Sequence, residues 1–149
     1  FGSKEELMEG RFRPGHFKGV DLVVSKLLHL VQPHRAYFGQ KDLQQFSIIK
    51  QLVDELFFPV DLVRVETVRE PSGLAMSSRN QRLSAKAKEE AAAIYAALTL
   101  GRSHLLQGHT TAQVKEVIEA RDQKEPEEEL AICVAGYLEE VRLIDNIIV

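Results

Sequence analysis

Three consecutive side chains in the segment 73–80 have the chemistry needed to bind phosphate: Ser77, Ser78 and Arg79. Hydroxyl groups and backbone amides donate hydrogen bonds to phosphate oxygens, and a guanidinium group makes forked, charge-assisted contacts with them. The segment begins with the small residues of Gly-Leu-Ala, which suit a loop. A polar surface turn has the same composition, so these eight residues alone leave both interpretations open.

A second polar stretch, residues 39–45, follows a short apolar run at 35–38 that is typical of a buried strand. The spacing of apolar residues predicts a helix from 41 to about 57, and the alternating, β-branched residues 60–65 predict a second strand. Strand, helix and strand with short connections indicate a βαβ unit with parallel strands. Ligands bind beyond the carboxyl ends of such strands, which is where 39–45 is predicted to lie.

Lys41 is predicted in the first turn of this helix, where a cation opposes the helix dipole. A bound anion would explain a lysine at this position. Asp42 and Gln45 are three residues apart and so share one helix face, and Gln45 lies below Lys41 on the same side. A solvated first turn is the alternative. Further upstream, Arg13 and His16 precede a helix predicted over 17–31. They could bind an anion together with the amides at the helix N-terminus. The alternative is that they belong to a basic surface loop.

The two halves of the chain differ in charge and in pattern. The whole chain of 149 residues has a net charge of −3, which gives no reason to expect nucleic acid as a partner. We expect a domain over 1–83, which holds the candidate site residues, and a smaller α+β domain over 84–149. The second contains a helix capped by Ser84, a capping box at Thr110, and strands at 130–138 and 142–146.

Several classes of function are disfavoured by what the sequence lacks. The five histidines show no metal-ligand spacing, and the single cysteine, Cys133, excludes an intrachain disulfide. No apolar stretch reaches membrane-spanning length and no signal peptide is visible, so we expect a cytoplasmic protein without membrane contact. The acidic tract 125–129 is predicted to be a solvated loop.

Four blocks in order resemble the C-terminal part of the pantothenate synthetases (pantoate–β-alanine ligases). They are Arg-Pro-Gly-His-Phe at 13–17, Tyr-Phe-Gly-Gln-Lys-Asp-Leu-Gln-Gln at 37–45, Gly-Leu-Ala-Met-Ser-Ser-Arg-Asn at 73–80, and Arg-Leu-Ile-Asp-Asn at 142–146. The resemblance covers nearly the whole chain but only about half of the family's protein. It implies an α/β fold: part of a Rossmann-like nucleotidyltransferase parallel sheet, followed by a small α+β C-terminal domain.

The resemblance also implies a reaction. Pantoate and ATP, with Mg²⁺, form pantoyl adenylate and pyrophosphate, and β-alanine then displaces AMP to give pantothenate. A cytoplasmic homodimer is implied as well. Adenylation needs no protein nucleophile, since the substrate carboxylate attacks the α-phosphate, so the protein must align the reactants and stabilise phosphate charge. The lack of a nucleophilic triad is then expected.

Site roles carry over residue by residue from the same blocks. The expected roles are phosphate for Lys41, Ser77, Ser78 and Arg79, ribose for Gly39 and Asp42, the adenine border for Val68 and Met76, and pantoate for Gln45, with Arg13 and His16 at the site's edge. No metal ligand is assigned within this sequence.

The sequence departs from the family in three respects. First, the sequence lacks the family's N-terminal half, which carries its paired histidines and most pantoate and magnesium contacts. Second, the segment before Arg142 is shortened. Third, Gln40 replaces an acidic residue. Two other functions therefore stay open. One is an adenylyltransferase acting on a different acid, and the other is a non-catalytic folding or dimerisation module.

Overall fold

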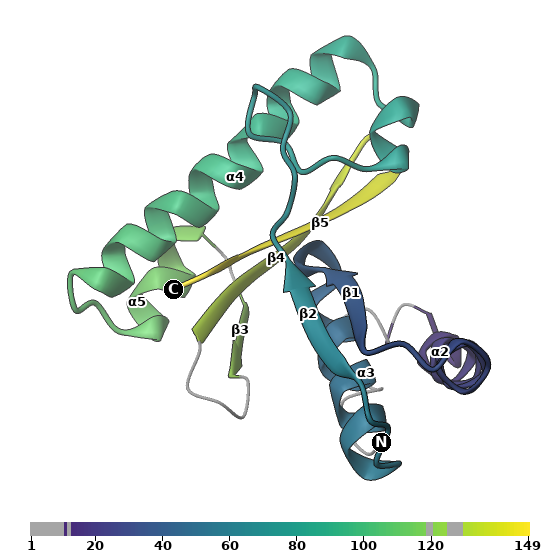
Figure 1. The fold of residues 1–149 in the computed structure, drawn as a ribbon. Coiled ribbons are helices and arrows are strands. Elements are labelled where there is room, and N and C mark those ends of the chain that lie inside the picture. The colour runs from purple at the N-terminus through teal and green to yellow at the C-terminus, as the bar shows by residue number, and fades with distance from the viewer. Residues whose placement is uncertain (1–10, 12, 119–120, 125–129) are drawn as a thin grey trace. The chain divides into compact units, whose positions relative to one another are not determined.

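The computed structural model describes residues 11, 13–118, 121–124 and 130–149. The chain forms two compact units, Phe1–Glu66 and Thr67–Val149. Figure 1 shows the elements of both units.

The first unit contains a parallel βαβ arrangement, as the sequence predicts. Its elements are α2 (His16–Val31), β1 (Arg35–Gly39), the 3₁₀ turn η2 (Gln40–Asp42), α3 (Leu43–Glu55) and β2 (Asp61–Val65). Strands β1 and β2 pair in parallel, from Arg35 opposite Asp61 to Gly39 opposite Val65. Helix α3 connects them and lies along one face of the pair (Figure 1). This confirms the predicted α/β fold class.

The core of the first unit joins both helices to one face of the strands. Leu28 of α2 packs with Ile49 and Val53 of α3, and Ala36 and Phe38 of β1 and Leu62 of β2 pack against them. Leu43, Phe46, Ile49 and Val53 of α3 are buried, whereas Leu56 follows the end of the helix and is exposed.

Helix α2 is apolar on more than one side. Phe17 and Leu28 are buried, but Val23, Leu27 and Val31 are exposed. Leu22 and Leu30 are exposed beside them, and Leu30 is 82% accessible. We call these five exposed residues the α2 apolar face. A helix that is apolar on nearly all sides is one that a larger core usually surrounds.

The second unit places helices against an antiparallel sheet. Its elements are η3 (Ser78–Arg82), α4 (Ala85–Leu106), α5 (Thr111–Ile118), β3 (Arg121–Lys124), β4 (Leu130–Leu138) and β5 (Val141–Ile148). The strands pair in the order β3-β4-β5, all antiparallel. Strand β3 was missed because its four residues are all polar. The acidic tract 125–129 lies outside the described residues.

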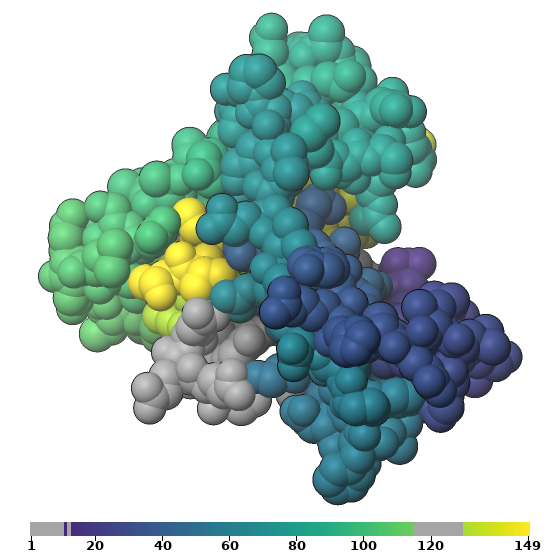
Figure 2. Space-filling model, in the orientation of Figure 1, coloured from purple at the N-terminus to yellow at the C-terminus, as the bar shows by residue number. Residues whose placement is uncertain are grey.

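The division between the units falls earlier than the sequence suggested. Leu74 and Leu83 are buried with Ala87 and Ala91 of α4 and with Val141 of β5. Segment 67–83 therefore belongs with the second unit, although the sequence assigned it to a domain ending at 83. In the space-filling view its atoms lie directly against those of α4 (Figure 2).

Both helix caps predicted from the sequence are present. The Ser84 Oγ accepts a hydrogen bond from the Ala87 amide at 3.2 Å, and Thr110 and Gln113 form a reciprocal capping box. The Ser84 hydroxyl also donates to Oε1 of Glu139 at 2.6 Å, and the Ser84 amide donates to Oε2 at 3.2 Å. Glu139 lies in the two-residue turn between β4 and β5 with a positive φ of 53°. These hydrogen bonds from Ser84, the side-chain one first, hold the pKa of Glu139 below its ordinary value.

Candidate functional site

The predicted phosphate segment follows a short hairpin. Arg69 and Ala75 form an antiparallel bridge, the Met76 amide donates to the Val68 carbonyl at 2.9 Å, and the Gly73 amide donates to the Glu70 carbonyl at 2.8 Å. The hairpin therefore turns at 70–73 and leads directly into Met76.

Gly73 is required at this turn for two reasons. Its φ is +90°, in the region that favours glycine. A Cβ built there would lie 2.7 Å from Cδ1 of Tyr95, which is closer than a carbon–carbon contact allows. Gly73 thus allows the turn to form and also allows it to pack closely against α4.

The exposed end of the hairpin presents an apolar pair. Val68 is 66% accessible and Met76 is 55% accessible. The hydrogen bond between their backbones makes them neighbours across the hairpin. Two adjacent, exposed apolar side chains directly before the predicted phosphate-binding residues could pack against a planar adenine ring. This is the role that the resemblance implies for them.

Ser77 and Arg79 are tied to the fold, while Ser78 is exposed. The Ser77 Oγ accepts a hydrogen bond from the Arg79 amide at 3.2 Å, so it caps η3. The Arg79 Nη1 donates to the Arg142 carbonyl of β5 at 3.3 Å, which the sequence did not suggest. A guanidinium carries five N–H groups, so this single contact leaves most of them for a phosphate.

Asn80 anchors the end of the segment, a role that sequence reasoning missed. It is buried, and its Nδ2 donates to Oε1 of Glu70 at 2.9 Å and to the Ala75 carbonyl at 3.1 Å. An asparagine directly after Ser-Ser-Arg was visible in the sequence, but its contact with Glu70 across the hairpin was not.

In the first unit, the predicted site residues follow the carboxyl end of β1. Gly39 ends the strand, and Lys41 and Asp42 lie in η2. Gln45 is in the first turn of α3, which begins at Leu43. Lys41 was predicted in the first α-helical turn and instead lies two residues before α3, in the tighter 3₁₀ turn. It is half-buried, whereas Asp42 is exposed.

Arg13 and His16 are brought together at the start of α2. The Arg13 Nη1 lies 3.0 Å from the His16 Nε2. Because arginine only donates, Nε2 is the acceptor of this hydrogen bond. An anion arriving here would compete with His16 for the guanidinium.

The predicted site residues thus form two groups. Residues 39–45, with Arg13 and His16, belong to the first unit, and Val68 with residues 76–79 belongs to the second. Among the described residues, no group of three or more His, Cys, Asp or Glu could hold a metal ion. No helix in the described ranges has the length and apolar character needed to cross a membrane.

The family model of pantoate–β-alanine ligase matches residues 2–148. The chain belongs to this family. Pantothenate synthetase of Cytophaga hutchinsonii is 43% identical over 172 residues, which cover 99% of this chain and 61% of the relative. That of Aquifex aeolicus is 47% identical over 126 residues, covering 84% and 45%. The chain therefore spans about three-fifths or less of these relatives' length.

Solved structures of the pantoate–β-alanine ligase family share the fold. Pantothenate synthetase from Thermus thermophilus superposes with a TM-score of 0.86 at 39% identity, over 99% of this chain and 61% of that protein. The Francisella tularensis ligase, complexed with beta-gamma ATP and beta-alanine, gives 0.68 at 35% identity, over 97% and 54%.

The aligned length also bears on the shortened C-terminal region. The alignment with the Cytophaga ligase runs over 172 residues, more than the 149 of this chain. That ligase therefore carries residues within the matched region that this chain lacks. That they precede Arg142 stays a prediction.

Proposed function

We propose that this chain is the C-terminal part of an ATP-dependent ligase that condenses pantoate with β-alanine through pantoyl adenylate. Family membership supports this assignment. The observation that carries it furthest in the structure is the hairpin, which presents the Val68–Met76 pair and then Ser77, Ser78 and Arg79 in a fixed order.

The proposed reaction has two steps. A pantoate carboxylate oxygen attacks the α-phosphorus of ATP, forming the acyl–phosphate bond and breaking the bond to pyrophosphate. The β-alanine amine then attacks the acyl carbon, loses a proton and expels AMP. Neither step uses a protein nucleophile, so charge stabilisation and alignment are the protein's contribution.

The residue roles follow from the chemistry of the side chains. Lys41, Ser78 and Arg79 donate to phosphate oxygens, and Ser77 contributes its hydroxyl and orients the start of η3. We also propose Gly39 and Asp42 at the ribose, Val68 and Met76 beside the adenine, Gln45 at pantoate, and Arg13 with His16 at the edge. These roles require the two groups of residues to approach the same nucleotide.

Mg²⁺ is the cofactor that the family resemblance implies, and among the described residues no group of three or more His, Cys, Asp or Glu could hold it. We therefore assign it no ligand in this part of the chain and derive no step from it. A cytoplasmic homodimer is likewise proposed from the resemblance. Sedimentation of a longer chain that includes the relatives' N-terminal part tests the dimer.

Pantoate-dependent exchange of labelled pyrophosphate into ATP tests the function. The assay uses a longer chain that supplies the relatives' N-terminal part. We expect exchange that requires both pantoate and Mg²⁺, and pantothenate formation on addition of β-alanine. Exchange with other carboxylic acids but not with pantoate would instead indicate a different adenylyltransferase.

The 149-residue chain alone tests the non-catalytic alternative, which its partial coverage of the relatives favours. We expect Mg·ATP to bind weakly and without turnover, as measured by calorimetry. Absence of ATP binding in both this chain and the longer one would contradict the nucleotide assignment altogether.

A further inference from the structure

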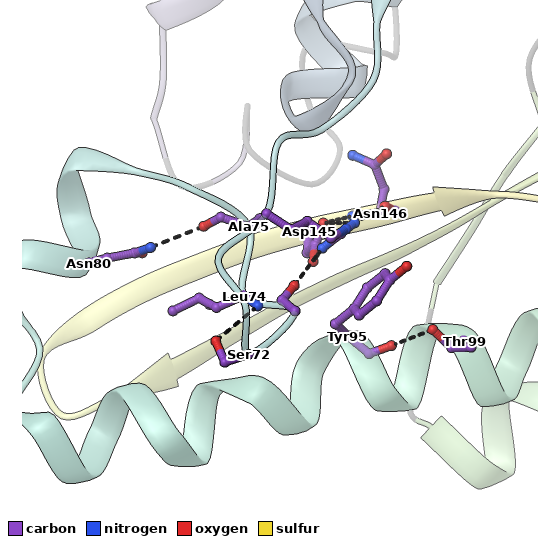
Figure 3. A network of polar contacts seen from close by, with 10 residues as sticks. Ser72, Leu74, Ala75, Asn80, Tyr95, Thr99, Asp145 and Asn146 are labelled. Atoms are coloured by element: carbon purple, nitrogen blue, oxygen red, sulfur yellow. Dashed lines mark hydrogen bonds and ion pairs between the residues drawn. The ribbon is translucent and has the colours of Figure 1, made fainter.

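Arg69 lies at the centre of a polar network that joins the hairpin to the sheet of the second unit. Its Nη1 donates to Oδ2 of Asp145 at 2.6 Å and its Nη2 donates to Oδ1 at 3.1 Å, so the pair is bidentate. Figure 3 shows Asp145 and Asn146 on β5, with Tyr95 of α4 beside them. The Arg69 Cζ lies 3.8 Å from the centroid of the Tyr95 ring.

The same guanidinium also contacts the backbone on both sides. Its Nη1 donates to the Gly73 carbonyl at 3.1 Å, within the hairpin turn, and its Nη2 donates to the Asn146 carbonyl at 3.3 Å, on β5. Arg69 therefore links the turn, the strand and helix α4 through one planar group. Its charge is already matched by Asp145, so it is not itself a phosphate ligand.

Asp145 is suited to hold this group in one position. Its side chain is 4% accessible, and its Oδ1 also accepts a hydrogen bond from the Asn146 amide at 2.8 Å. The carboxylate is thus held by the backbone of the next residue as well as by Arg69. A carboxylate this buried is stable as an anion only with such partners.

Segment 76–79 is consequently held from both ends on the same strand. The Arg69 network precedes it, and the bond from Arg79 to Arg142 follows it on β5, the strand that carries Asp145. Asn80 closes the hairpin behind it through Glu70 and Ala75. The exposed Ser78 lies between these anchors.

We infer that Arg69 is a positioning residue that acts through Asp145 to hold segment 76–79 in its phosphate-binding position. The inference rests on the proposed function for the role of that segment. A lysine cannot replace Arg69, because an ammonium group cannot make the bidentate contact, reach both carbonyls and stack on Tyr95 together. The step that depends on this positioning is the binding of the ATP phosphates during adenylation.

The first test measures order in the segment and does not depend on activity. Hydrogen exchange of the 149-residue chain is compared for wild type, Arg69→Lys and the control Arg82→Lys, which changes an exposed arginine at the end of η3. We expect exchange of the 73–79 amides to rise about tenfold or more in Arg69→Lys, because charge-assisted hydrogen bonds are lost. Exchange in α3 and in the Arg82→Lys variant should be unchanged. Unchanged exchange at 73–79 in Arg69→Lys would overturn the inference.

The second test separates positioning from general loss of folded protein, in the longer chain described above. We expect Arg69→Lys to lower kcat/KM for ATP in pyrophosphate exchange by about tenfold or more. Reaction of supplied pantoyl adenylate with β-alanine, in which no pyrophosphate is held, should change less than about threefold. Equal losses in both half-reactions would indicate unfolding and overturn the positioning role.

A double-mutant cycle tests the route through Asp145. If Arg69 acts through this carboxylate, Arg69→Lys with Asp145→Asn should be little worse in exchange than Asp145→Asn alone. Additive losses would contradict that route. If the longer wild-type chain shows no pantoate-dependent exchange, the proposed function fails, and the hydrogen-exchange result alone decides whether Arg69 orders the segment.

Discussion

The two stretches proposed to hold the nucleotide obtain their shape differently. In the first unit, residues 39–45 follow local backbone structure: β1 ends at Gly39, a 3₁₀ turn carries Lys41, and α3 begins at Leu43. In the second unit, residues 76–79 are held by side chains distant in sequence, since Arg69 meets Asp145 across 76 positions.

This difference predicts where substitutions should alter the two stretches. The backbone of the 39–45 stretch is set by the end of β1, by η2 and by the start of α3. The 76–79 segment depends on β5 and α4, so a change in Asp145, which would touch no ligand, should alter the proposed phosphate contacts. The predictions below test this contrast.

The largest expected effect is on stability and comes from Asp145→Ala. Removing one partner of a buried ion pair costs about 3–5 kcal/mol, because the other charge is left without compensation. Arg69 is 17% accessible, so we expect the lower end of that range. Urea denaturation of the second unit measures the change. Asp54→Ala, at an exposed aspartate of α3, is the control and should leave stability unchanged.

Removing a proposed phosphate ligand from each stretch comes next. Lys41→Ala and Arg79→Ala should each lower the rate of adenylation by at least about tenfold, since each loses charge-assisted contacts worth about 1.5–3 kcal/mol. Pyrophosphate release by the longer chain measures this, with the exposed Lys26→Ala as control. Arg79→Ala should also lose about 1 kcal/mol of stability through its contact with Arg142. Wild-type pyrophosphate release in both variants would refute their phosphate role.

Two glycine substitutions sharpen the comparison directly. Gly73→Ala should destabilise the second unit by about 1–3 kcal/mol, because of the positive φ and the clash with Tyr95. Gly39→Ala should leave stability nearly unchanged, since its φ is −70° and no atom lies within 4 Å of the added Cβ. Thermal unfolding measures both. Equal destabilisation by the two changes would show that 39–45 is as constrained as the hairpin.

A smaller effect is expected at the start of α4. Ser84→Ala should cost about 1 kcal/mol through the lost cap and leave adenylation unchanged. A loss of activity without a loss of stability would instead indicate that Ser84 contacts the reactants.

The pH dependence of Glu139 gives the smallest effect. Because its pKa is lowered in the folded chain, its contribution to stability is present above the unfolded pKa and is lost as pH falls through the folded one. We expect Glu139→Gln to flatten the fall in melting temperature on the acid side. An identical acid slope in both proteins would show that the bonds to Ser84 contribute nothing.

The sequence allowed prediction of features that arise from neighbouring residues. The helix capped by Ser84, the parallel strands and the capping box at Thr110 all follow from periodicity and local hydrogen bonding, and all are confirmed. Side-chain chemistry and position suggested Ser77, Ser78, Arg79 and Lys41 as site residues, and the family resemblance supplied the individual roles, which stay predictions.

What could not be predicted depends on contacts between distant residues. Asp145 was visible in the Arg-Leu-Ile-Asp-Asn block, but no sequence pattern shows that its carboxylate faces Arg69. The boundary between the units, which falls before residue 83, also depends on contacts between distant residues, because Leu74 and Leu83 are buried by β5 and α4. Strand β3 escaped prediction because its four polar residues lack the apolar alternation by which strands are recognised.

The α2 apolar face affects how the 149-residue chain behaves when it is purified alone. Its exposed leucines and valines form an apolar surface of the kind that drives self-association. We therefore expect this chain to bind a hydrophobic dye and to scatter more light as its concentration rises. Replacing Leu30 with a lysine should reduce both signals without disturbing the packing of Leu28.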